Sequence, residues 1–176
     1  MENRKDDFDN AFNQLILNEG GYSNDPVDPG GKTIYGVTSR DYPKEFNDIY
    51  YLFTHGQKQL ALMRTKSFYK RTFWNPLYED IPDSSLAFKI FDLSVNRGVK
   101  TAVKLLQQTL FFDFGQNLTI DGVFGRGTLE ALKSIVNTEL FYQKYIERNE
   151  SSYKKLSTFW KFGKGWLNRL RKRVYV

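Results

Sequence analysis

The chain has 176 residues, of which 40% are hydrophobic, and a formal net charge of +6, with no cysteine and one histidine. No apolar run reaches the roughly 18 residues of a membrane-spanning helix, and the charged start Met1-Glu2-Asn3-Arg4-Lys5 is unlike a secretory signal. The lack of cysteine excludes disulfides, a cysteine nucleophile and thiolate metal sites. The single histidine, His55, precedes Gly56, which indicates a solvated turn residue. Because one histidine cannot form a zinc site without several carboxylate partners, we expect no metal, and we expect no other cofactor. Hydrolytic chemistry would then depend mainly on carboxylates.

The apolar spacing predicts a mainly helical chain of one domain or two small lobes. Phe8, Phe12, Leu15 and Ile16 predict a first helix, which ends at Gly20-Gly21 and leaves Glu19 in its last turn. The glycines and prolines of residues 20–32 cannot continue it, and the β-branched residues of 32–38 predict a short strand.

The rest of the chain shows helical spacing interrupted by turn residues. An Asp-Gly turn at 121–122 and the glycines at 125 and 127 separate two of these helices. Two prolines and three acids in 75–83 predict a boundary between a catalytic region, 1–80, and a helical region, 81–176, packed against it. The expected helices cover about 57–72, 83–98, 99–112, a stretch from Thr128, 138–156 and 164–173.

Three carboxylates lie close together in the sequence, at Glu19, Asp25 and Asp28. The negative end of a helix raises the pKa of a Glu there, at a cost of about 0.3–1 kcal/mol. If apolar neighbours also desolvate Glu19, it could remain protonated near neutral pH and donate a proton. Asp28, in a glycine-rich loop, would stay ionised, and such a pair supports acid-catalysed glycoside cleavage. Alternatively, Glu19 is a surface residue and both Asp-Pro pairs only open turns. Spacing alone leaves both interpretations open.

The segment from Asn18 to Thr38 contains Glu-Gly-Gly-Tyr, Asp-Pro, Gly-Gly-Lys-Thr and Gly-Val-Thr. It resembles the signature of glycoside hydrolase family 108, the N-acetylmuramidases of bacteria and phages. The resemblance implies a lysozyme-like helical fold with a short β-hairpin or loop after the first helix, and Glu19 as the general acid. The segment is also similar to the Glu, Asp and Thr array of phage-type lysozymes. That similarity implies Asp28 as base or electrostatic stabiliser, with Asp25 as its competitor, and Thr33 as a holder of the attacking water.

The resemblance also suggests substrate-binding residues: Tyr22, Asp25 and Tyr35 near the groove, and Asn96 further along the chain. Each tyrosine has an equal explanation as a core residue. Stretches 91–98, 121–129 and 162–169 resemble the predicted peptidoglycan-binding module of the same family. The Asp-Gly turn at 121–122 also has a purely structural explanation, because glycine tolerates positive φ.

The resemblance therefore implies a lysozyme that hydrolyses the β-1,4 bond between N-acetylmuramic acid and N-acetylglucosamine. A lytic transglycosylase and a non-catalytic peptidoglycan-binding or secretion accessory protein are the alternatives. The sequence does not decide between retention and inversion, which depend on the separation of the carboxyl groups. We expect a monomeric prophage endolysin that acts at the cell wall or in the periplasm after holin-type release or export.

The last 26 residues, 151–176, contain eight Lys and Arg and no acid. Such a tail suits a polyanionic partner. The alternative is a terminal helix docked through the buried stripe that Trp166, Leu167 and Leu170 would form. We do not expect nucleic acid to be the partner.

Overall fold

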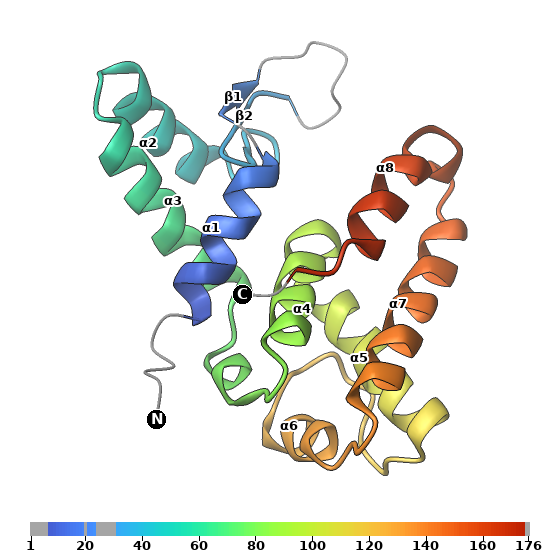
Figure 1. The fold of residues 1–176 in the computed structure, drawn as a ribbon. Helices are drawn as coiled ribbons and strands as arrows, with labels where there is room; N and C mark the ends of the chain where they lie inside the picture. Colours follow the sequence, from blue (N-terminus) through green and yellow to red (C-terminus); the bar gives the residue numbers. More distant parts are fainter. Residues whose placement is uncertain (1–6, 20, 24–30, 175–176) are drawn as a thin grey trace. The chain divides into compact units, whose positions relative to one another are not determined.

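The computed structural model describes residues 7–19, 21–23 and 31–174 (Figure 1). The chain forms two compact units, Phe8–Trp74 and Asn75–Val176. The described residues contain eight α-helices, a short 3-10 helix and one antiparallel sheet. The predicted mainly α fold class is confirmed. The assignment of separate functions to 1–80 and 81–176 stays a prediction.

The first unit packs three helices around a small sheet, with aromatic side chains as its core. Phe8 and Trp74 meet edge to face with ring centroids 5.4 Å apart, and Phe12 lies 5.8 Å from Tyr69. Such ring pairs add to the free energy gained from burying apolar area. The elements are α1 (Asp7–Glu19), β1 (Tyr22–Ser23), β2 (Thr33–Ile34), β3 (Val37–Thr38), α2 (Pro43–Thr54) and α3 (Lys58–Phe73).

The second unit is built around α4, in which every residue from Ser85 to Ser94 is buried. Asp83 begins this helix, because its side chain accepts hydrogen bonds from the backbone N–H groups of Ser85 and Leu86. α5 and α8 both pack with α7, and α5 also packs with α4. The elements are η2 (Pro76–Asp80), α4 (Ser84–Arg97), α5 (Val99–Phe114), α6 (Arg126–Lys133), α7 (Thr138–Lys154) and α8 (Phe159–Arg171).

The structure corrects the expected elements in three places. The helix α2 was not predicted, although Pro43 at its first turn and the spacing of Phe46, Ile49 and Phe53 are helical signals. The single strand expected over 32–38 is a hairpin of β2 and β3. The last helix begins at Phe159 rather than at 164, because glycine 163 packs within a helix instead of ending it.

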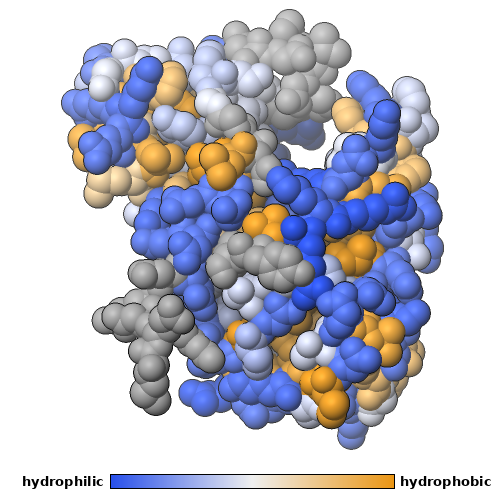
Figure 2. Space-filling model, in the orientation of Figure 1, coloured by the Kyte–Doolittle hydropathy of each residue, from blue (hydrophilic) through white to orange (hydrophobic). Residues whose placement is uncertain are grey.

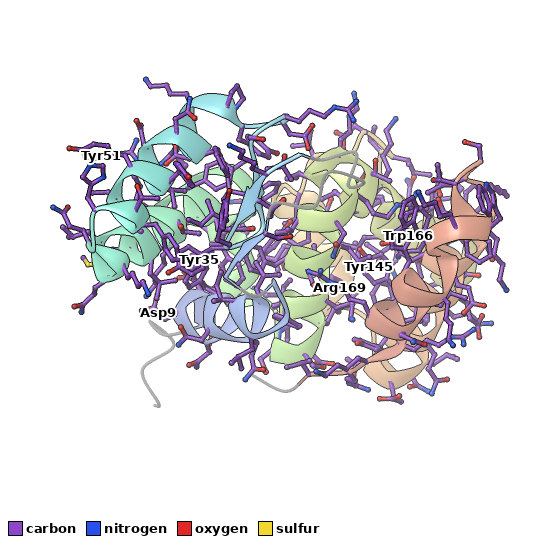
Figure 3. The ribbon with its side chains drawn as sticks, turned by 90° about the horizontal axis from the view of Figure 1, so that it is seen from above. Asp9, Tyr35, Tyr51, Tyr145, Trp166 and Arg169 are labelled. Atoms are coloured by element: carbon purple, nitrogen blue, oxygen red, sulfur yellow. The ribbon has the colours of Figure 1, made fainter. Side chains whose placement is uncertain are left out.

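A buried charge cluster joins α4 to α8 in the second unit. The Lys89 side chain is only 1% exposed, and its Nζ donates to the backbone carbonyls of Arg169 (3.2 Å) and Lys172 (2.9 Å). The guanidinium of Arg169 donates to Asp92 through Nε at 2.9 Å (Figure 3). Burial lowers the pKa of Lys89, and the Asp92 carboxylate acts in the opposite direction. The ion pair and the carbonyls together compensate for the loss of water around these charges.

Acidic side chains also neutralise much of the basic tail. Arg171 and Lys154 pair with Glu150, at 2.9 and 2.7 Å, and Arg173 pairs with Asp83 at 3.0 Å. Four further basic residues have no ion pair within the described part of the chain. They are Lys155, Lys161, Lys164 and Lys172.

The structure supports the docked-helix interpretation of the tail. Leu170 is 1% exposed, and the Trp166 ring stacks on Tyr153 with centroids 5.3 Å apart. On the face shown in Figure 2, hydrophilic residues surround scattered hydrophobic patches in both units. In the part of the chain that the structure describes, no helix has the length and apolar character needed to cross a membrane.

Replacing Asp92 by alanine should destabilise the second unit by about 3–5 kcal/mol, because the buried Lys89 and the partly exposed Arg169 would lose their counter-charge. The measurement is the urea-unfolding transition. Lys144→Ala is the control, because it removes the ion pair between Lys144 and Glu147, and both of these side chains are largely exposed. Equal midpoints for the two variants would contradict a structural role for the buried cluster.

Candidate active site

The carboxylates predicted to act in catalysis are only partly covered by the structure. Glu19 is the last residue of α1, as the sequence predicted, and the last turn of this helix carries no basic residue that would offset its dipole. Its side chain lies outside the described residues. Asp25 and Asp28 lie wholly outside them. Their roles therefore stay predictions.

A tight hairpin holds the predicted groove residue Tyr35. Tyr35 and Gly36 have φ values of 47° and 79° and link Ile34 to Val37, which is the geometry of a type I′ turn. Glycine is favoured at such a turn, whereas tyrosine at positive φ is uncommon and needs support. The Tyr69 hydroxyl donates to the Tyr35 carbonyl at 3.1 Å, and the Tyr35 N–H donates to the carbonyl of Gly21 at 3.2 Å. The turn is thereby tied both to α3 and to the residue two positions after Glu19.

Thr33 lies in the middle strand of the sheet. It is paired with Ser23 of β1 and with Thr38 of β3. Directly paired residues share one face of a sheet, while successive residues alternate between faces. Ile34 and Val37 are fully buried, so Thr33 belongs to the opposite face, together with the Ser23 and Thr38 hydroxyls. The sheet thus carries three hydroxyl groups on one face.

The two predicted groove tyrosines meet an aromatic side chain of α2. The Tyr22 ring lies 6.5 Å from Phe53 and 5.5 Å from Tyr50, and the Tyr35 ring meets Phe53 edge-on at 5.9 Å. Tyr22 remains 39% exposed. Partial loss of solvent and the neighbouring Tyr50 hydroxyl raise the pKa of Tyr22, so its hydroxyl stays protonated and can donate. Sequence reasoning missed Tyr50 and Phe53, because it missed the whole helix.

Asn96 belongs to the other compact unit. It is an exposed residue near the end of α4, and its side-chain amide donates to the carbonyl of Asp92 at 2.7 Å. This bond to its own helix gives Asn96 a local structural explanation. A role for Asn96 in substrate binding stays a prediction.

The Asp-Gly turn that resembles part of a binding module has a complete structural explanation. The buried side chain of Gln107 donates to Asp121 (2.9 Å) and to the carbonyl of Val123 (3.1 Å), while its Oε1 accepts from the Gly122 N–H (2.8 Å). The hydrogen bond from Gln107, with a second from the Val123 N–H, lowers the pKa of Asp121. Ligand contact by this turn stays a prediction.

The residues described offer little to a metal ion. No group of three or more His, Cys, Asp or Glu among them is placed to hold one. The single histidine, His55, follows α2 directly and stacks on the Tyr51 ring at 4.0 Å. Its exposed position agrees with the predicted turn residue.

Comparison with known proteins bears directly on the segment from α1 to α4. Residues 12–98 match the model of the family Glycosyl hydrolase 108. The match contains Glu19, the whole sheet, α2 and α3, and it supports a glycoside hydrolase of peptidoglycan. It ends at Gly98, so it does not cover most of the stretch that resembles a peptidoglycan-binding module.

The chain is also similar to a solved structure, SagA from Brucella abortus. The two share 26% sequence identity and superpose with a TM-score of 0.69, over 93% of this chain and 88% of SagA. The expected lysozyme-like helical fold, with a short hairpin after the first helix, is confirmed. No curated protein sequence matches the chain.

Replacing Gly122 by alanine should cost about 1–3 kcal/mol of stability, because alanine is strained at a φ of 81°. The added Cβ would also lie 2.8 Å from the Lys100 carbonyl oxygen. Gly127→Ala is the control, since nothing lies within 4 Å of its Cβ and alanine favours the helix. The two unfolding midpoints in urea should differ clearly, and a Gly122→Ala midpoint equal to that of the wild type would refute this account of the turn.

Proposed function

We propose that the protein is an N-acetylmuramidase that hydrolyses the β-1,4 bond between N-acetylmuramic acid and N-acetylglucosamine. The observation that carries this proposal is the Glycosyl hydrolase 108 match over residues 12–98. That range includes Glu19, the last residue of α1, and the sheet that follows it in the chain. The spacing of the carboxylates alone did not decide whether they act in catalysis. The similarity to a family of glycoside hydrolases supports glycoside cleavage as their role.

In the proposed reaction Glu19 is the general acid. The C-terminal end of α1 disfavours negative charge, and no basic side chain in its last turn counters this effect. If apolar neighbours also desolvate Glu19, its side chain would stay protonated and could give its proton to the glycosidic oxygen as the bond breaks. The sugar then passes through a state with oxocarbenium character, which a second carboxylate can stabilise.

Asp28 is the proposed second carboxylate, with Asp25 as its competitor. The loop that carries both connects β1 to β2, whose hydroxyl-bearing face includes Thr33 and Ser23. A water held by Thr33 would be positioned for attack with Asp28 as base, or Asp28 would stabilise the charge directly. Tyr22 and Tyr35 would support the sugar rings, because aromatic side chains offer large apolar faces.

The proposed site of action is the peptidoglycan layer, reached after holin-type release or export, as for a prophage endolysin. The fold similarity to SagA leaves two further candidate activities. A lytic transglycosylase would form a 1,6-anhydro end without using water, and a non-catalytic accessory protein would bind walls and release nothing. Mass spectrometry of the products separates all three, because a muramidase leaves a reducing-end muramic acid.

Replacing Glu19 by glutamine should lower the clearing rate of purified cell walls by at least about 100-fold, because the amide cannot supply the proton. Turbidity clearing measures the rate. Circular dichroism shows whether the variant is folded. Glu45→Gln is a matched control, since this glutamate pairs with Arg64 and Arg71 in the same unit. Clearing by folded Glu19→Gln at the wild-type rate would disprove the assignment.

The two loop aspartates can be ranked by single amide substitutions. Asp28→Asn should reduce kcat by about 100-fold or more, with a smaller change in KM, if its charge acts on the transition state. Asp25→Asn should change KM more than kcat. Steady-state kinetics on labelled glycan strands give both values, and the reverse pattern would assign the second carboxylate to Asp25.

A further inference from the structure

The helix α2 has two chemically different faces. Glu45 and Asp48 on one face pair with Arg64 of α3, and Arg71 also pairs with Glu45. These ion pairs neutralise the acids of α2 against the adjacent helix. The acidic side chains Glu45 and Asp48 of α2 are therefore used in ion pairs with α3.

The other face of α2 carries Phe46, Tyr50 and Phe53, which recur at helical spacing. Phe46 is buried and stacks on Tyr50 with centroids 5.6 Å apart. Tyr50 and Phe53 are half-buried and meet the exposed ring of Tyr22 from β1. The buried ring anchors the others, so they form a supported surface rather than a set of free side chains.

A lysine lies at each end of this surface. Lys32 Nζ is 5.9 Å from the Tyr50 ring centroid, and Lys58 Nζ is 5.3 Å from that of Phe53. Both lysines are exposed, and neither has an ion pair with another described residue. We call Lys32, Tyr22, Tyr50, Phe53 and Lys58 the aromatic–lysine patch. It combines apolar area with two positive charges within the first unit.

We propose that the aromatic–lysine patch binds the carboxylate-bearing stem peptide of a peptidoglycan strand. This inference rests on the proposed function, and it adds the part of the substrate that sets specificity. An uncharged sugar would use the rings but would gain little from two ammonium groups. The stem peptide supplies both chemical features, aliphatic side chains for the rings and free carboxylates for the lysines.

The location of the patch fits this role. Tyr22 lies three residues after Glu19, and Lys32 adjoins Thr33 of the hydroxyl-bearing face. A glycan bound by the residues around Glu19 would carry its peptide substituents within the same unit. The Tyr35 ring, which meets Phe53, links the groove residues to the patch.

Binding of defined ligands to the Glu19→Gln variant tests the inference without turnover. Three ligands are compared by calorimetry: a disaccharide–tetrapeptide, the same compound with its carboxylates amidated, and the peptide-free disaccharide with its lactyl carboxyl amidated, so that it carries no charge. The free acid should bind roughly five- to tenfold more tightly than the other two, as expected for two exposed charge pairs. Adding Lys32→Ala and Lys58→Ala should abolish this preference.

Lys44→Ala in the same background is the control, because Lys44 is an exposed lysine of α2 outside the patch. It should keep the full preference for the free acid. Equal affinity of the Glu19→Gln protein for all three ligands would overturn the inference, as would a preference that survives loss of both patch lysines. Failure of the muramidase proposal is seen separately, in the clearing assay and in the products.

Discussion

The second unit depends on one constraint: a lysine side chain that is 1% exposed must keep its charge compensated inside the protein. Lys89 cannot be satisfied within α4 alone, because a helix uses its own carbonyls internally. Its Nζ bonds carbonyls at the end of α8, and Arg169 of the same helix pairs with Asp92. The terminal helix is therefore an integral part of the core of the second unit. The charge of Arg169 is used in an ion pair inside this unit. Within the described part of the tail, Lys155, Lys161, Lys164 and Lys172 are the basic residues left without an ion pair.

In the first unit, the element that needs support from its neighbours is the short sheet. Strands of two residues have little stability of their own. The hairpin survives because Ile34 and Val37 are buried and because the Tyr69 hydroxyl fixes the strained Tyr35. These stabilising contacts lie on one face of the sheet, whereas on the other face the Thr38 hydroxyl donates to Asp41 at 2.9 Å. The hydroxyl-bearing face is therefore held rigid by a core that packs against the opposite face of the sheet.

The sequence predicted the helical class, the ends of α1 and α4 and the break at Asn75, since each depends on local signals such as Gly20-Gly21 and the Asp83 cap. It failed where tertiary contacts decide. The last helix was expected to begin at 164, yet Gly163 is buried against Phe159 inside α8. For the candidate site, the sequence pointed to Tyr22 and Tyr35, whose roles stay predictions, but not to Tyr50 and Phe53, whose contact with Tyr22 of β1 depends on the fold. The cluster around Lys89 could not be predicted from the sequence either, because Lys89 and Asp92 contact residues that lie 77 to 83 positions further along the chain.

That long separation has a consequence for biosynthesis. A chain emerges from the ribosome from its N-terminus, and its domains generally fold in that order. The ring pairs Phe8–Trp74 and Phe12–Tyr69 both lie within residues 8–74, so these core contacts can form while the rest of the chain is still being made. α4 emerges with Lys89 and Asp92 uncompensated and must wait until α8 has been translated. The second unit is thus open to chaperones and proteases for longer than the first, and a ribosome stalled before Arg169 would leave a folded first unit attached to an unfolded second one.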